Sequence, residues 1–139
     1  MRALRSTLLV AVALSTILTT TPLFAHHSFA AEFDANKPVT LKGVVTKMVW
    51  SNPHAWIYLD VKGSSGGVVN WAIETGSPNA LYRQGWRKTD LPAGAQLTIE
   101  GFLAKDGTAT VNAANITLPD GRRLFAGSSG TGAPADSRR

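Results

Sequence analysis

The sequence predicts an all-β protein with one short helix, folded as a small five-stranded barrel of the OB type. Three observations predict this class. Five runs rich in β-branched and aromatic residues follow one another, and a short helical segment separates the third run from the fourth. Gly43 and Gly101 lie inside the first and fourth runs, where the strands of a small barrel need sharp bends.

Turn residues set the limits of these elements. The expected strands are residues 39–50, 54–62, 68–74, 96–104 and 108–118. The glycine- and serine-rich stretch 63–67 closes the second strand, and Asp106-Gly107 is a tight hairpin signal. Pro119-Asp120-Gly121 turns the chain into residues 122–125.

The helix is expected over residues 79–84. Ser77 can cap its amino terminus, because a serine hydroxyl accepts a hydrogen bond from a backbone N–H of the first turn. Pro78 fits the first helical position, and Gly85 fits the position just after the last turn.

Residues 1–25 have the pattern of a secretory signal peptide. Arg2 and Arg5 precede an apolar run at residues 8–18, which is too short to span a bilayer, and cleavage is expected after Ala25. The alternative, a retained membrane anchor, fits this length less well. We therefore expect a periplasmic protein with an arm at residues 26–38, a barrel domain at 39–125 and a disordered tail at 126–139.

Composition excludes several classes of site. The chain has no cysteine, so it has neither disulfides nor thiolate ligands. Its net charge of +5 includes the two signal-peptide arginines, so the exported chain is only mildly basic and no nucleic-acid partner is expected. No nucleophile–base motif is present. The acidic residues are scattered along the sequence and are expected to be solvated at the surface, so no enzymatic activity is expected. These acidic residues are Glu32, Asp34, Asp60, Glu74, Glu100 and Asp106.

The first hairpin can be placed in register from its pattern. A loop at residues 51–53 would pair Trp50 with His54, Met48 with Trp56, Thr46 with Tyr58 and Val45 with Leu59. One face is then apolar and is disrupted only by Lys47. It holds Leu41, Gly43, Val45, Val49, Ala55, Ile57, Leu59 and Val61. The opposite face would gather Met48, Trp50, His54, Trp56 and Tyr58.

This second face is interpreted in two ways that can coexist. As an exposed apolar patch it would bind a partner or a small ligand, chiefly through Trp50, Trp56 and Tyr58. Alternatively, the arm or the carboxy-terminal segment covers it as a second small core. An arm that folds over the patch would bring His26 and His27 toward His54.

The three histidines indicate a copper site. Cleavage after Ala25 would place the free α-amino group on His26, beside His27. Amine and imidazole nitrogen suit Cu(II), whereas the thioether of Met48 with an imidazole suits Cu(I). The alternatives are a frayed amino terminus for His26 and His27, and a backbone hydrogen bond for the His54 ring.

Several motifs resemble one exported bacterial family. They are residues 26–29 (HHSF), 37–43 (KPVTLKG), 52–56 (NPHAW), 76–79 (GSPN), 85–86 (GW) and 120–122 (DGR). Together they resemble the family catalogued as domain of unknown function 6152. The resemblance implies a periplasmic location and no particular chemistry. By shape and residue types the domain is also loosely similar to small periplasmic copper chaperones, although Met48 is its only methionine after residue 25.

The sequence therefore predicts a periplasmic binding protein that takes copper at His26, His27 and His54, with Met48 as a further candidate ligand. The alternative is a protein- or small-ligand-binding module that uses the aromatic face without metal. In either case we expect no membrane anchor after signal cleavage.

Overall fold

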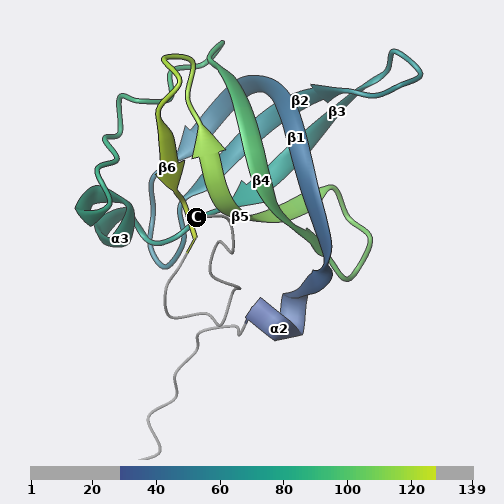
Figure 1. The fold of residues 1–139 in the computed structure, drawn as a ribbon, viewed down its shortest axis with the longest axis horizontal. Helices are drawn as coiled ribbons and strands as arrows, with labels where there is room; N and C mark the ends of the chain where they lie inside the picture. Colours follow the sequence, from purple (N-terminus) through teal and green to yellow (C-terminus); the bar gives the residue numbers. More distant parts are fainter. Residues whose placement is uncertain (1–28, 128–139) are drawn as a thin grey trace, which may run out of the picture.

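The computed structural model describes residues 29–127, which form six strands and two short helices (Figure 1). The predicted signal peptide, His26, His27 and most of the predicted tail lie outside these residues. The elements in chain order are α2 Phe29–Glu32, β1 Phe33–Val49, β2 Trp56–Lys62, β3 Val68–Glu74, α3 Pro78–Arg83, β4 Gln96–Ala104, β5 Thr110–Thr117 and β6 Arg123–Phe125.

The strands pair in a mostly antiparallel ring. β1 pairs with β2 on one side and with β4 on the other, while β2 pairs with β3 and β4 pairs with β5. The ring closes where β3 and β5 run parallel, through three residue pairs from Ala72–Thr110 to Glu74–Asn112. β6 adds to the outer edge of β5.

The predicted elements are largely confirmed. β3 and β4 have the predicted limits, and the single predicted helix is α3. The expected strand count of five is corrected to six, because the segment after the Pro119-Asp120-Gly121 turn pairs with β5 as β6. β1 begins at Phe33, within the segment expected to be an arm, because it continues along β4 as far as the Phe33–Ala104 pair.

The start of the described chain is fixed by aromatic packing. The Phe29 ring stacks on Phe33 with centroids 5.8 Å apart and meets Phe102 edge-on at 5.4 Å. The Lys105 backbone N–H donates to the Glu32 carbonyl at 2.9 Å, and the Lys105 ammonium donates to the Ala30 carbonyl at 2.6 Å. α2 is therefore held against the end of β4.

The core fills the inside of the ring. Apolar side chains from all five strands of the ring are almost completely buried, among them Val45, Leu59, Ile73, Ile99 and Val111. Leu81 of α3 and Trp86 close one part of this core, and the Trp86 indole N–H donates to the Phe125 carbonyl at 3.0 Å. Figure 1 shows α3 beside β6, on the outside of the strands.

The carboxy-terminal end of the described chain also belongs to this core. Ala126 is fully buried, its N–H donates to the Ala114 carbonyl at 2.9 Å, and its carbonyl accepts from the Gly76 N–H at 2.8 Å. The first residues of the segment predicted as a tail are thus packed against β5 and the start of α3.

The predicted register of the first hairpin holds only at its far end. Val45 pairs with Leu59 as expected, but Lys47 pairs with Tyr58, Met48 with Ile57 and Val49 with Trp56. Thr46 is the extra residue of a β-bulge, and one inserted residue moves every later side chain to the opposite face. The expected pairs of Met48 with Trp56 and of Thr46 with Tyr58 are therefore wrong.

The bulge redistributes the two faces of the hairpin. Met48 now shares the core face with Ile57, and both Met48 and Trp50 pack against the core. Val49, which was expected in the core face, lies opposite Trp56 instead. Lys47, the residue that disrupted the predicted apolar face, places its ammonium 5.7 Å from the centre of the Tyr58 ring. The other predicted core residues Leu41, Val45, Ala55, Ile57 and Leu59 are buried.

No helix within residues 29–127 is long and apolar enough to cross a membrane.

Candidate functional site

His54 lies directly before β2, where backbone hydrogen bonds hold the chain against the end of β3. The Ala55 N–H donates to the Gly76 carbonyl at 3.1 Å, and the Thr75 N–H donates to the Ala55 carbonyl at 3.0 Å. The loop that precedes His54 contains a cis peptide bond between Asn52 and Pro53. These contacts position the imidazole beside the carboxyl end of β3.

One nitrogen of the His54 ring contacts hydrogen-bond acceptors of the protein itself. Nδ1 lies 3.1 Å from the Thr75 carbonyl oxygen and 3.5 Å from Oε1 of Glu74. A carbonyl oxygen can only accept, so Nδ1 carries a proton and the neutral ring keeps its lone pair on Nε2. The backbone-bonded alternative for His54 is thus present, and it leaves the second nitrogen available to a ligand.

Glu74 is a buried carboxylate, not the surface group that the sequence suggested. Its side chain is 8 % exposed, and its Oε1 accepts a hydrogen bond from Nδ2 of Asn112 at 3.3 Å. The two residues form the last pair of the parallel β3–β5 ladder, so the closure of the ring brings them together. The Asn112 Oδ1 is buried and has no hydrogen-bond partner within the described chain.

A cavity of about 310 Å³ opens in front of His54. It is bounded by the loop before β2, by Glu32 of α2, by Trp56 of β2 and by Glu74. A second cavity of about 510 Å³ shares Glu32, Trp56 and Glu74 with the first and continues toward the β4–β5 turn. The two cavities therefore adjoin along α2, with Trp56 and two carboxylates between them.

The structure gathers some of the residues predicted for the site and separates others. His54 and Trp56 line one cavity together. Met48 and Trp50 pack against the core, and Tyr58 contacts Lys47 on the outer face. Glu32, Glu74 and Asn112 were not predicted as site residues. The pairing of Glu74 with Trp56 follows from strand register, but its burial depends on β5, which lies far away in the sequence.

Within residues 29–127, no group of three or more histidine or acidic side chains is arranged to hold a metal ion. The described chain contributes one imidazole and nearby carboxylates, so a metal at this cavity needs further ligands. His26 and His27, the other predicted ligands, lie outside the described residues.

A family model matches residues 14–113, a span that includes His54, Trp56, Glu74 and Asn112. Its description is "Family of unknown function (DUF6152)". The chain belongs to the DUF6152 family. The resemblance predicted from the sequence motifs is thereby confirmed. No curated protein and no solved structure matches this DUF6152 chain.

Proposed function

We propose that this DUF6152 protein is a periplasmic, non-enzymatic binding protein that takes a copper ion at His54, His26 and His27. The single observation that carries the proposal is the Nδ1 contact of His54 with the Thr75 carbonyl at 3.1 Å. In protein metal sites a ligating histidine generally donates its other ring N–H to a carbonyl or carboxylate, which fixes the tautomer and orients the ring. His54 has this arrangement at the wall of a cavity.

The position of α2 supports the contribution of the amino-terminal histidines. Phe29 is anchored in the Phe33–Phe102 cluster two residues after His27, and Glu32 lines the His54 cavity. Five residues from Glu32 back to His27 span at most about 17 Å when fully extended. A chain cleaved after Ala25 would add the α-amino nitrogen of His26, and two imidazoles with an amine are good ligands for Cu(II). Because the Met48 side chain packs against the core, the proposed site leaves it out.

The strand arrangement supports an OB-type barrel as the scaffold. The ring order β1-β2-β3-β5-β4, with α3 between β3 and β4, is the order expected for this fold. In such a scaffold the loop between β1 and β2 presents His54 at one end of the ring.

The test is a copper titration of the chain that begins at His26, followed by calorimetry and electron paramagnetic resonance. The informative variant is His54→Asn, whose amide nitrogen can replace Nδ1 as the donor to Thr75 while Nε2 is removed. We expect Cu(II) affinity to fall at least about tenfold, the loss of one ligand contact, and the nitrogen hyperfine pattern to change. His26→Ala/His27→Ala should lose Cu(II) binding as well.

His54→Gln is the matched control for packing, because its amide lies nearer the position of Nε2. Circular dichroism of both variants checks that the ring of strands is intact. Unchanged copper affinity and an unchanged spectrum for His54→Asn would refute the three-histidine site.

A second candidate function is metal-independent binding of a protein or small ligand. The observation that favours it is Trp56, which lines both adjoining cavities and so offers an apolar wall beside polar groups. Of the aromatic residues predicted for this role, Trp50 and Tyr58 do not line either cavity. Under this alternative Trp56→Ala abolishes binding and His54→Asn weakens it only modestly, the reverse of the order expected for copper.

A further inference from the structure

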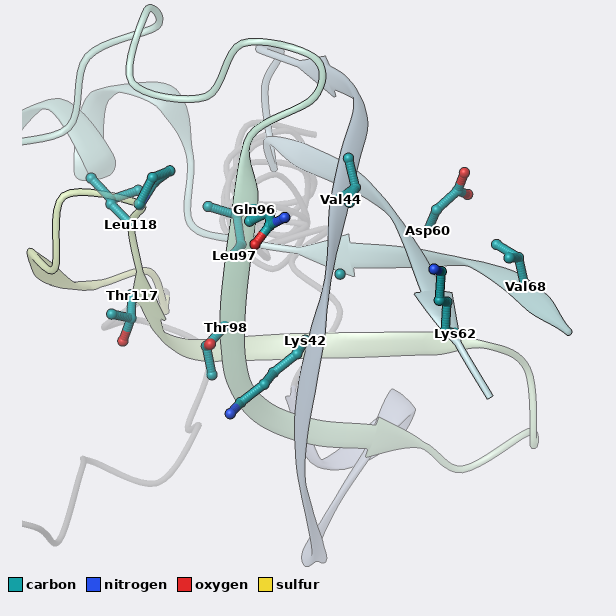
Figure 2. Close-up of a pocket in the computed structure, with 12 residues that line it drawn as sticks. Lys42, Val44, Asp60, Lys62, Val68, Gln96, Leu97, Thr98, Thr117 and Leu118 are labelled. Atoms are coloured by element: carbon teal, nitrogen blue, oxygen red, sulfur yellow. The ribbon is translucent and has the colours of Figure 1, made fainter. Parts of the chain in front are cut away.

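A third cavity, of about 640 Å³, lies where β1 leaves β2 to pair with β4 (Figure 2). It shares no lining residue with the cavities around His54. Its volume is in the range of small-molecule sites, and its lining combines apolar side chains with a few polar groups.

Strand register places the polar groups of this cavity on one face. Lys42 of β1 is directly opposite Thr98 of β4, and Thr98 is directly opposite Thr117 of β5. Residues directly opposite one another project on the same side of a sheet, so the ammonium and the two hydroxyls form one row. Figure 2 shows Lys42 extended alongside Thr98, on the side of Thr117.

A second lysine lies on the same face, across β1. Val44 pairs with Asp60, and Lys42 and Lys62 are each two residues from that pair, so both side chains share its face. Among residues 29–127, neither lysine has an ion-pair or hydrogen-bond partner. Asp60 is the only acidic residue of the lining, and its carboxylate accepts a hydrogen bond from Asn70 at 2.7 Å.

This face offers several hydrogen-bond donors to a bound group. Lys42 and Lys62 are exposed, and the side chains of Thr98 and Thr117 have no hydrogen-bond partner within the described chain. Two ammonium groups and two free hydroxyls are the donors that a carboxylate or similar anionic group accepts from.

Apart from Gln96, the remaining lining of the cavity is apolar. Leu97, Leu118 and Pro119 lie on the β4–β5 side, and both leucines are already buried in the core. Val44 is 39 % exposed and Val68 is 58 % exposed, which makes them two of the most exposed large apolar residues in the described chain. An aliphatic or aromatic body seated here would remove this surface from water.

We propose that this cavity binds an amphiphilic organic anion, such as a medium-chain alkyl carboxylate. Its head group accepts hydrogen bonds from Lys42, Thr98 and Thr117, Lys62 adds a second positive charge, and its apolar chain covers Val44 and Pro119. This site is independent of the proposed copper site, since the two have no residue in common.

The test uses decanoate and decylammonium, which have the same alkyl chain and opposite head-group charges. Calorimetry and NMR titration of the full exported chain should show saturable binding of decanoate only. In Lys42→Ala/Lys62→Ala, decanoate affinity should fall at least about tenfold, because charge-assisted hydrogen bonds are removed. Arg83→Ala/Lys88→Ala is the matched control: it removes two charges from exposed residues that lie outside the cavity lining and should leave affinity unchanged.

Three outcomes overturn the proposal: no decanoate binding, equal binding of decylammonium, or undiminished affinity in the double lysine variant. Thr98→Asp is a second test in case the double lysine variant does not fold. One added negative charge in the same row should repel decanoate and so lower its affinity. His54→Asn should bind decanoate as the wild type does, so failure of the copper site and failure of this site are distinguished.

Discussion

At the scale of single residues, the informative observation is the choice of hydrogen-bond partner by His54. Its Nδ1 meets a backbone carbonyl, and a buried carboxylate lies 3.5 Å away. This choice decides which ring nitrogen can act on a ligand, and it is independent of which ligand binds. Asn112 in turn holds Glu74, so the polar network extends from the cavity wall into the β3–β5 ladder.

Gly43 is another residue whose role is decided by one contact. A Cβ at this position would clash with the Asp60 carbonyl oxygen and lie 2.9 Å from the Leu59 side chain. We expect Gly43→Ala to lower the free energy of unfolding by about 1–3 kcal/mol, because overpacking forces the backbones of β1 and β2 apart. Urea denaturation measures the change.

Gly67→Ala provides the control for this prediction, because a Cβ there has no neighbour nearer than the Ser65 hydroxyl at 4.0 Å. If the two alanine variants are equally stable, close approach of the strands is not the reason for glycine at position 43.

At the scale of elements, the β1 bulge has the largest consequence for the site. Thr46 is accommodated through its hydroxyl, which donates to the Tyr58 carbonyl and accepts from the Asn70 amide, both at 3.2 Å. The extra residue moves Met48 into the core face, so β1 offers the His54 cavity no thioether from that position. Alternation along the strand could not predict this, since a bulge requires knowledge of the partner strand.

The helix α3 yields a prediction about its cap. The Ser77 hydroxyl accepts from the Ala80 N–H at 3.3 Å, and Pro78 occupies the start of the helix. Ser77→Ala should lower the free energy of unfolding by about 0.5–2 kcal/mol, the usual effect of losing an N-cap acceptor. Chemical denaturation measures the loss.

Ser77→Asp keeps a side-chain acceptor at the same position and should retain most of the stability. An equal loss in both variants would show that packing at position 77, and not the cap, stabilises α3.

At the scale of the whole molecule, stability should depend on two turn carboxylates as the pH is lowered. Hydrogen bonds from Thr108 hold the pKa of Asp106 below its ordinary value of 3.8. Hydrogen bonds and charge from Arg122 do the same for the pKa of Asp120. Arg122 also contacts Asp90, so this pair ties the β5–β6 turn to the loop after α3.

A carboxylate with a lowered pKa in the folded state stabilises the protein above its unfolded pKa, and this contribution disappears as the pH falls through the folded value. We therefore expect the melting temperature of the wild type to fall more steeply below about pH 4 than that of Asp106→Asn/Asp120→Asn. Each asparagine keeps one acceptor oxygen and removes the charge, although at position 120 one of the two hydrogen bonds from Arg122 is lost. Parallel melting curves across the acid range would contradict the prediction.

The ring also separates the two candidate sites. The His54 cavity lies between α2, the β1–β2 loop and the end of β3, whereas the lysine-lined cavity lies where β1 passes from β2 to β4. The proposed copper site would draw further ligands from the chain before residue 29, whereas the residues of the proposed anion site all lie within the described chain. Each proposal can therefore be tested while the other site is intact.

The sequence by itself determined most of the secondary structure and the family. Alternating apolar residues, turn glycines and the Ser77-Pro78 cap are local signals, and they placed β3, β4 and α3 correctly because local preference and tertiary environment agree there. The family motifs can likewise be recognised without a structure, and the DUF6152 match confirms the family that they indicated.

Only the tertiary structure decided which residues meet. The parallel β3–β5 pairing buries Glu74 against Asn112, a contact between residues 38 positions apart. The bulge at Thr46 removes Met48 from the expected binding face, and the Thr75 carbonyl fixes the tautomer of His54. Burial, register and proton position depend on pairs of segments, so they cannot be predicted from the sequence of one segment alone.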